Sequence, residues 1–352
     1  MTIDTRNDCQ TIDIALPLDP ETKIKLTEFV NHCNGTHYRQ LPAWLEVLDY
    51  DQCRFFISRT RRGDIVASSI YRVLQSRIPL YSAGEIARGP IAISNEHLAQ
   101  HLDDILQFVK QDICTLFVNP FVADDDALQV EEKLVNLGFH ATTESGYYTH
   151  TLSANIRSSA AEQWRGLRRS TRTAINKARK CGLSVRLESE SQAYGNFSRS
   201  YSKFARARGI ITLSPDISAG IFTHFVDKQA SNAFLLSAIV ENSTVGQILL
   251  MKCCSQLIYE WGWTATASIE QKLPIMHPLL WDAINIARSE NCTALDLGGY
   301  WMDRDNSDPI NQFKLGFSKK IVRYCGQFEY VFSPNVQRLR SVVRKLGQLF
   351  DN

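Results

Sequence analysis

Apolar residues in the first half of the chain follow two different spacings. Between Asn95 and Lys110 they recur every three or four positions, which predicts a helix. On both sides of the Arg62–Asp64 turn they alternate with polar residues, which predicts two strands. The predicted strands are Arg54–Arg59, Ile65–Leu74 and Cys114–Val118, and short helices are predicted at Thr22–Cys33 and Ala43–Leu48. This half is therefore expected to be a sheet covered by helices.

The second half shows the same mixture of patterns. The predicted strands are Leu183–Leu187, Ala233–Val240, Val245–Lys252, Leu257–Trp263 and Thr293–Leu297, with a closing strand pair in Ile321–Phe332. The predicted helices are Tyr194–Arg208, Phe222–Gln229 and Pro278–Ser289. Strands and helices alternate only in part, so we expect an α/β protein with mixed sheets of the α+β kind rather than a doubly wound parallel sheet.

Between the halves lies a segment with clear helix signals. Ser159 and Glu162 match a capping box, and Gly182 stands where a helix C-cap is common. Apolar residues in between recur at helical spacing, while arginines and lysines occupy much of the remaining surface. We predict one helix over 159–182 with one packed face and one strongly positive face.

Short identical strings recur at a constant offset. Cys114-Thr115 returns as Cys292-Thr293, and Leu137–Phe139 returns as Leu315–Phe317, each 178 positions later. Since 352 residues also suit two domains, we interpret the chain as two similar halves. The predicted domains are residues 1–155 and 156–352, the second including the linking helix 159–182 and a C-terminal helix at 335–350.

Composition predicts that a signal peptide, a membrane span, disulfides and a metal site are absent. The acidic start of the chain, Met1–Pro20, does not resemble a signal peptide, and the longest apolar stretch, Ala233–Val240, is too short to cross a bilayer. Nine cysteines without a CxxC pair and histidines without an HExxH motif suggest neither a disulfide framework nor a metal site. We therefore expect a cytoplasmic protein with no metal and no integral membrane association.

The segments around 296–299 and 311–317 could carry chemistry. Glycines there let the backbone approach a ligand, and Lys314 has Asn136 as its repeat partner, so the charge belongs to one copy only. A lysine at a cleft can stabilise the oxyanion formed when an amine attacks an ester or thioester, although a surface lysine is the plainer alternative. Asp296 could orient the acceptor amine or take its proton, or simply cap a turn.

Several of these strings resemble the Fem family of peptidoglycan-bridge aminoacyltransferases. They are Arg168–Gly182, Asp296–Gly299, Phe313–Phe317 and the Arg-Gly-Pro turn in Ala87–Pro90, in the family's order, and the resemblance spans roughly residues 50 to 332. The resemblance implies two tandem domains of the acetyltransferase (GNAT) fold. It also implies transfer of an amino acid from aminoacyl-tRNA to an amine of a cell-wall precursor.

The resemblance also implies roles for Lys314 and Arg172, and the residue types themselves suggest roles for Asp296, Arg88, Tyr259 and Trp261. Lys314 would steady the tetrahedral intermediate, with Asp296 as the second candidate catalytic residue, and Arg172 would lie near an anionic substrate. Arg88 would bind a phosphate or pair with a neighbouring carboxylate. Tyr259 and Trp261, predicted on one aromatic face, would form a substrate wall or pack in the core. The candidate substrate-binding residues are Arg88, Arg172, Tyr259, Trp261, Gly298, Gly299 and Phe313.

Two departures from the family pattern keep alternatives open. No sustained heptad stretch predicts a coiled-coil arm, and Gln271–Ile275 lacks the glycine-rich loop that binds acetyl-CoA in ordinary acetyltransferases. Aminoacyl-tRNA is the favoured donor, acyl-CoA is the alternative, and a non-enzymatic binding module is the third reading. We expect no tightly bound cofactor and a cell-wall-precursor or natural-product amine as acceptor. The stretch Asn335–Phe350 is expected to pack on the second domain, with peripheral membrane contact as its alternative.

Overall fold

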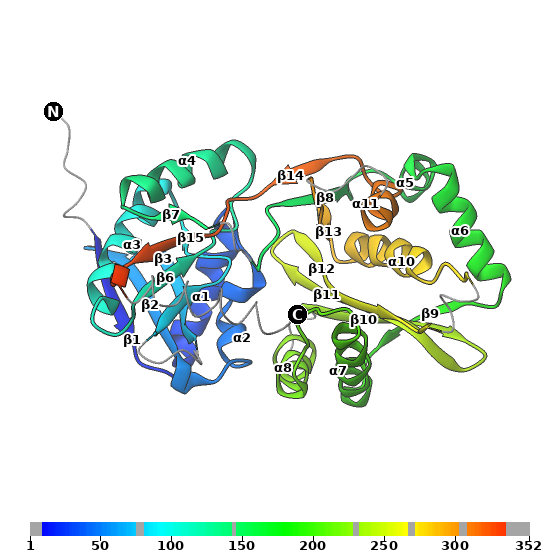
Figure 1. The fold of residues 1–352 in the computed structure, drawn as a ribbon, viewed down its shortest axis with the longest axis horizontal. Helices are drawn as coiled ribbons and strands as arrows, with labels where there is room; N and C mark the ends of the chain where they lie inside the picture. Colours follow the sequence, from blue (N-terminus) through cyan, green and yellow to red (C-terminus); the bar gives the residue numbers. More distant parts are fainter. Residues whose placement is uncertain are drawn as a thin grey trace. The chain divides into compact units, whose positions relative to one another are not determined.

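A computed structural model of the chain describes residues 9–74, 81–142, 146–227, 232–266, 272–302 and 308–335. These residues form two compact units, each built on one mixed sheet (Figure 1). The first unit holds the described residues up to Thr149 together with those from Arg323 on, and the second runs from His150 to Val322. The predicted fold class, α/β with mixed sheets in two tandem domains, is confirmed.

The first unit is a sheet in the order β1-β2-β3-β4-β6-β15-β7, with β5 paired to β3. Its strands are β1 (Cys9–Ile14), β2 (Cys53–Thr60), β3 (Ile65–Leu74), β4 (Ala83–Ile86), β5 (Ile91–Ala92), β6 (Thr115–Val118), β7 (His140–Ala141) and β15 (Phe328–Val331). Its helices are α1 (Pro20–His32), α2 (Pro42–Leu45), α3 (Asn95–Val109) and α4 (Asp124–Asn136). Leu102 of α3 and Val130 of α4 share one core with Leu116 of β6, so both helices cover the same face.

The second unit has the strand order β14-β8-β13-β12-β11-β10-β9. Its strands are β8 (His150–Asn155), β9 (Ser184–Glu188), β10 (Ala233–Val240), β11 (Ser243–Cys253), β12 (Gln256–Thr264), β13 (Ala294–Gly299) and β14 (Ile321–Arg323). Its helices are α5 (Ala160–Gly166), α6 (Arg169–Lys180), α7 (Ser191–Arg206), α8 (Pro215–Ile221), α10 (Met276–Ser289) and α11 (Pro309–Leu315), with a π-helical turn at Phe222–Asp227. Among the described residues, no helix combines the length and the apolar composition that crossing a bilayer requires.

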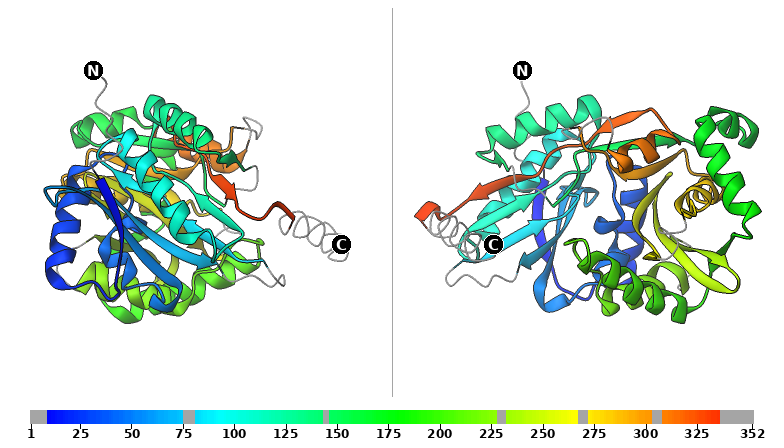
Figure 2. Two further views of the ribbon diagram at one scale, coloured as in Figure 1. Left: turned by 90° about the vertical axis from the view of Figure 1, so that its left-hand side faces the viewer. Right: turned by 45° about the vertical axis from the view of Figure 1, so that its right-hand side comes forward.

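Helices cover both faces of the second sheet. Figures 1 and 2 show α7 and α8 together on one face, with α6 and α10 on the other. Ile175 of α6 and Leu280 of α10 are fully buried in one core with Leu250 of β11. The apolar face of α6 therefore packs as its helical spacing predicts, which leaves the basic face outside this core.

The repeat found in the sequence has a structural counterpart. The order α3, β6, α4, β7 in the first unit returns as α10, β13, α11, β14 in the second. Cys114 and Cys292 precede the corresponding strands β6 and β13, and Gly138 and Gly316 follow the corresponding helices α4 and α11. The identical strings thus mark equivalent positions in two copies of one fold.

The two copies exchange strands, which corrects the predicted closing pair in Ile321–Phe332. β14 adds to the second sheet beside β8, whereas β15 lies between β6 and β7 of the first sheet, with Phe328 in register with Val118. The division therefore differs from the predicted boundary after residue 155: β8 belongs to the second unit, and the chain returns to the first unit at Arg323. The predicted helix at 335–350 lies outside the described residues beyond Asn335.

The predicted single helix over 159–182 is also corrected, because the structure has two helices there. Leu167 and Arg168 are extended, with ψ of 145° and 146°, so α5 ends before them and α6 begins after them. Leu167 is buried, and the backbone N–H of Arg168 donates to the carbonyl oxygen of Gly316 at 3.0 Å. Docking onto the end of α11 thus breaks a segment whose local sequence favours a continuous helix.

Candidate active site

The second sheet is split between β12 and β13. These parallel strands are in register over three residue pairs, Gln256 with Ala294, Leu257 with Leu295 and Ile258 with Asp296. As far as the structure describes the strands, their register ends there, and β12 continues beside β11 while β13 continues beside β8. Strand edges that part in this way can receive an amide or an extended ligand.

A β-bulge shapes the end of β13 at this split. The register with β8 shifts between Asp296, paired with Ser153, and Gly299, paired with Thr151. Gly298 within the bulge has a φ of 73°, which favours glycine. A Cβ there would lie 3.2 Å from the carbonyl oxygen of Tyr259 and 3.5 Å from Nζ of Lys314. The glycine therefore serves the backbone conformation and the close approach of the Tyr259 carbonyl, while Lys314 lies at ordinary contact distance.

Lys314 reaches this bulge from α11. Its side chain is almost fully buried, Nζ donates to the carbonyl oxygen of Gly299 at 2.6 Å, and Nζ lies 5.3 Å from the ring centroid of Trp301. Burial lowers the pKa of Lys314 to about 8, and the negative charges of Asp296 and Asp308 oppose that effect. The result is a protonatable amine held at the split end of the sheet.

Asp296 lies inside the sheet at the base of the bulge and is completely buried. Its Oδ1 accepts from the backbone N–H of Gly298 at 2.7 Å and from the hydroxyl of Thr151. The same hydroxyl also lies 3.0 Å from the carbonyl oxygen of Gly298. These contacts fix the bulge, and they place a negative charge close enough to act on Lys314.

Tyr259 and Trp261 lie on opposite faces of the sheet, contrary to the prediction of one aromatic face. A bulge in β12 puts Tyr259 opposite Leu250 but Trp261 opposite Leu249, and adjacent residues of a strand point to opposite faces. A Cβ on Gly262 would lie 2.4 Å from the Tyr259 hydroxyl, so this glycine gives the ring its space. Of the two aromatic residues, the backbone and ring of Tyr259 border Gly298.

The Phe313 side chain packs against two other aromatic rings and not against Lys314. Its ring makes edge contacts with His277, at a centroid distance of 4.8 Å, and with Phe317, at 5.5 Å. Burial lowers the pKa of His277 to about 4, so its ring is neutral near pH 7. The structure thus connects α11 firmly to the first turn of α10.

The side chain of Arg172 is half-buried, unlike the exposed basic residues of α6, and turns toward α5. One guanidinium nitrogen donates to the carbonyl oxygens of Leu167 at 2.5 Å and Arg165 at 2.9 Å, and lies 3.5 Å from that of Trp164. These carbonyls belong to the last turn of α5 and to Leu167, which follows it, where helical partners are lacking. The side chain therefore holds the corner between α5 and α6.

Arg88 belongs to the first unit. It is 2% exposed, and its guanidinium carbon lies 5.2 Å or less from the ring centroids of Phe121, Tyr147 and Tyr148. A guanidinium nitrogen lies 3.4 Å from the carbonyl oxygen of Tyr148. Among the described residues no carboxylate forms an ion pair with Arg88, and aromatic rings surround its guanidinium instead. The alternative of phosphate binding at Arg88 stays a prediction.

Comparison with known proteins bears on this arrangement of two similar units and one split sheet. No protein-family model and no curated protein matches the sequence. The crystal structure of FemX, however, aligns with a TM-score of 0.73 at 16% identity, covering 94% of this chain and 99% of FemX. The chain has the FemX fold.

Two further structures extend the comparison. L-PGS from Bacillus licheniformis aligns with a TM-score of 0.59 at 12% identity, covering 93% of this chain and 96% of that one. A tandem GNAT protein from the clavulanic acid biosynthesis pathway, solved without AcCoA, aligns with a TM-score of 0.57 at 12% identity over 93% of this chain and all of its own. At these identities the likeness to FemX and to both proteins concerns the fold, and it agrees with the predicted tandem GNAT architecture.

The structure adds three residues that sequence reasoning missed. Thr151 comes from β8, which is remote in sequence from Asp296, so no local pattern points to it. Trp301 approaches Lys314 across a segment without a readable period. Asp308 accepts from the N–H groups of Ile310 and Asn311 and caps α11. An Asp-Pro pair is a known helix start, so this last residue could have been found.

Proposed function

We propose that this protein is an N-acyltransferase of the Fem type, which moves an aminoacyl group from aminoacyl-tRNA to the amine of a small-molecule or cell-wall-precursor acceptor. The observation that carries the proposal is a buried lysine beside the bulge of β13, at the split between β12 and β13. The sequence resemblance implies that a lysine of the same motif acts at the reaction centre, and the likeness to the FemX fold supports the proposed type of enzyme.

In the proposed reaction, the neutral acceptor amine attacks the ester carbonyl carbon that joins the amino acid to the tRNA ribose. A C–N bond forms, the carbonyl oxygen becomes an oxyanion, and the ammonium of Lys314 stabilises it. The C–O bond to the ribose then breaks, and the proton lost by the amine ends on the leaving ribose hydroxyl. A donor and acceptor pair thus yields an amide and deacylated tRNA.

The surroundings of Lys314 suit this role. With a pKa of about 8, the amine is mostly protonated at pH 7, so the positive charge is present when the oxyanion forms. Its only described hydrogen bond goes to Gly299, which leaves two ammonium hydrogens for a reacting oxygen. Asp296 and Gly298 act as positioning residues, because their hydrogen bond maintains the bulge that Lys314 approaches.

Acyl-CoA remains the second candidate donor. The observation that favours it is the match to a tandem GNAT protein whose structure was solved without AcCoA. A thioester would follow the same course at Lys314, with the thiol as leaving group. The two donors differ in the part that does not react, tRNA or coenzyme A, while the chemistry at Lys314 is the same for both. A transfer assay with each donor therefore distinguishes them.

The deciding experiment measures transfer with the purified full chain. A mixed pool of labelled aminoacyl-tRNA is supplied with an extract of small amines, and acyl-CoA is supplied in a parallel reaction. Lys314→Met removes the charge at nearly constant side-chain length, and we expect a rate about 100- to 1,000-fold lower. The matched control is Lys319→Met, because Lys319 lies five residues away and is exposed.

Each outcome points to one reading. Transfer from tRNA that requires Lys314 but not Lys319 supports the Fem-type reaction and identifies the amino acid. Transfer from acyl-CoA alone assigns the protein to the acyl-CoA class. Equal transfer by wild type and Lys314→Met would refute the role of the lysine, whereas no transfer from either donor would favour the binding-module alternative. Activity should also fall as pH rises through about 8, since Lys314 then loses its proton.

A further inference from the structure

Trp301 lies beside the ammonium of Lys314, shortly after the end of β13. Nζ of Lys314 stands over the indole, 5.3 Å from the ring centroid. At this distance the electron-rich face of an aromatic ring attracts a cation. Lys314 is 5% exposed, whereas Trp301 is 37% exposed. The indole is therefore the outer of the two groups, and the charge of Lys314 lies on its inner side.

Packing in the core does not explain the position of this indole. Within the described residues, the hydrophobic core of the second unit takes in Tyr300, the neighbour of Trp301, but not Trp301 itself. An aromatic ring of this size contributes most to stability when it is buried in a core. The position of the ring outside the core and next to a charge therefore points to a role at Lys314.

Asn311 fixes the backbone of Trp301. This asparagine lies on α11 and is buried. Its Oδ1 accepts from the backbone N–H of Trp301 at 3.3 Å, and its Nδ2 donates to the carbonyl oxygen of Trp301 at 2.8 Å. Lys314 follows three residues later on the same helix, and residues at this spacing lie on one face. One helix thus carries both the lysine and the buried amide that places the ring beside it.

The titratable groups around Lys314 determine what a pH titration of this site reports. Two carboxylates act on the ammonium, Asp296 from β13 and Asp308 from the N-cap of α11. Further titratable groups that face these elements are Tyr259 of β12, Arg168 before α6 and His277 of α10. Burial raises the pKa of Tyr259 and lowers the pKa of His277 to about 4, while an arginine keeps its proton. Between pH 6.5 and 9, Lys314 is therefore the member of this set that changes its charge.

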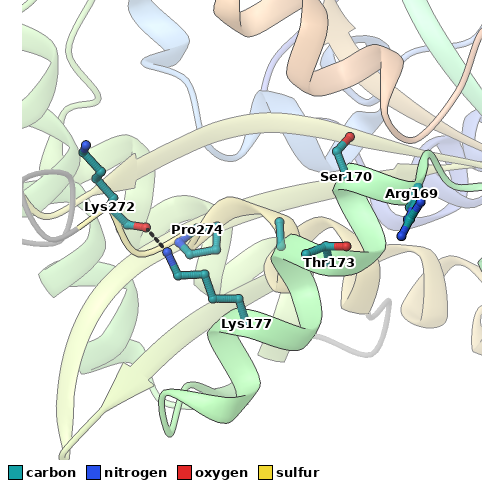
Figure 3. Close-up of a pocket in the computed structure, with 7 residues that line it drawn as sticks. Arg169, Ser170, Thr173, Lys177, Lys272 and Pro274 are labelled. Atoms are coloured by element: carbon teal, nitrogen blue, oxygen red, sulfur yellow. Dashed lines mark hydrogen bonds between the residues drawn. The ribbon is translucent and has the colours of Figure 1, made fainter.

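A second lysine of this unit provides a comparison. Lys177 and Arg169 of α6 line a pocket of about 530 Å³ beside the segment that leads into α10 (Figure 3). Nζ of Lys177 lies 3.3 Å from the carbonyl oxygen of Lys272, so it contacts a backbone carbonyl as Lys314 does. Lys177 is exposed, however, and no aromatic ring of the described residues lies under its ammonium. Burial and the indole thus distinguish Lys314, and Lys177 supplies a matched control.

We propose that Trp301 is a positioning residue of the transfer reaction: its ring face holds the Lys314 ammonium in place and favours the charged form, and Asn311 keeps the ring there. This inference rests on the proposed function, in which that charge stabilises the oxyanion. A carboxylate in the place of the ring would attract the ammonium too, but it would neutralise the charge that the oxyanion needs. The indole attracts the cation while it carries no net charge of its own.

The test changes the electrons of the ring and leaves its size almost unchanged. A tetrafluorinated tryptophan is incorporated at position 301 of the full chain, because fluorine withdraws negative charge from the ring face while the burial of Lys314 stays the same. Urea unfolding is followed by far-UV circular dichroism between pH 6.5 and 9. In the wild type, the free energy of unfolding starts to rise near pH 8, where the folded protein releases the proton of Lys314. We expect this onset to lie about 0.5 to 1 pH unit lower in the fluorinated protein.

Three backgrounds locate the effect of the fluorinated ring. In Lys314→Met the titrating amine is gone, so fluorination should not change the pH dependence of unfolding. In Asn311→Ala the ring is no longer fixed, so fluorination should move the onset by less than about 0.2 pH unit. Lys177→Met keeps Asn311, Trp301 and Lys314 together, and its onset should move as far as that of the wild type.

Transfer assays then connect the ring to the reaction. Because less Lys314 is protonated at pH 8, the fluorinated protein should be about two- to fivefold slower there and about equal to the wild type at pH 6. A shifted unfolding onset without transfer from either donor would leave the action of the ring on Lys314 standing and refute the proposed function. An unchanged onset, or a fluorine effect that persists in Lys314→Met or Asn311→Ala, overturns the inference. Transfer that requires Lys314 would still stand in that case, since it is judged by its own assay.

Discussion

Replacing Lys314 with methionine is expected to change the stability of the protein in a pH-dependent way. Lys314 is almost fully buried, and burial lowers its pKa from 10.5 to about 8. In the unfolded chain the ammonium is hydrated and keeps its ordinary pKa. Below pH 8 both states carry the proton, so the folded state bears the whole cost of keeping a charge away from water.

The size of the effect follows from these two pKa values. Between pH 8 and 10.5 the unfolded chain holds a proton that the folded chain has released, so the free energy of unfolding rises with pH. At roughly 1.36 kcal/mol for each pH unit, this interval is worth about 3 kcal/mol. Methionine has no such titration. Losing the hydrogen bond to Gly299 shifts the variant's stability by about 1 to 3 kcal/mol, in the opposite sense to removing the charge.

The assay is urea unfolding of wild type, Lys314→Met and Lys319→Met, followed by tryptophan fluorescence between pH 7 and 10.5. Wild type should gain about 3 kcal/mol relative to Lys314→Met across this range. Because Lys319 is exposed, the free energy of unfolding of Lys319→Met should stay within about 0.5 kcal/mol of the wild-type value at every pH. A wild-type minus Lys314→Met difference that stays constant with pH would refute the argument that a charge is buried at this position.

Three further predictions concern the supports of the two units. Gly298→Ala and Gly63→Ala both force alanine into a left-handed backbone, at about 1 to 2 kcal/mol each. Only the first lies beside Lys314 and would press on the carbonyl oxygen of Tyr259, so equal turnover of the two variants would contradict the site geometry. Arg172→Ala should lower the free energy of unfolding by about 1 to 3 kcal/mol by exposing the end of α5, whereas Lys180→Ala should not. Burial lowers the pKa of His101 to about 3, so between pH 6.5 and about 3 only the unfolded chain gains the proton. Acidification over this interval should therefore lower the free energy of unfolding by about 4 kcal/mol. Acid unfolding that is unchanged in His101→Asn would count against this last prediction.

The sequence alone determined the parts of this protein that depend on neighbouring residues. Ala233–Val240 was predicted as a strand and is β10 to the residue, because a buried strand shows itself as one apolar run. The constant offset between Cys114 and Cys292 revealed the two copies, since equivalent positions keep equivalent residues. The motif strings also led to Lys314, which the structure places at the split end of the second sheet. Whether it is catalytic stays a prediction.

Tertiary structure alone decided which partners each segment meets. No local pattern shows that β15 returns to the first sheet, because strand exchange depends on pairing with residues more than 200 positions away. The bulge that separates Tyr259 from Trp261 comes from the register with β11, and the break at Leu167 comes from docking on α11. Arg172 and Arg169 look alike in sequence, yet one holds a helix end and the other lines a pocket. Periodicity specifies an element and its buried face, whereas long-range contacts determine what a side chain on that element can reach.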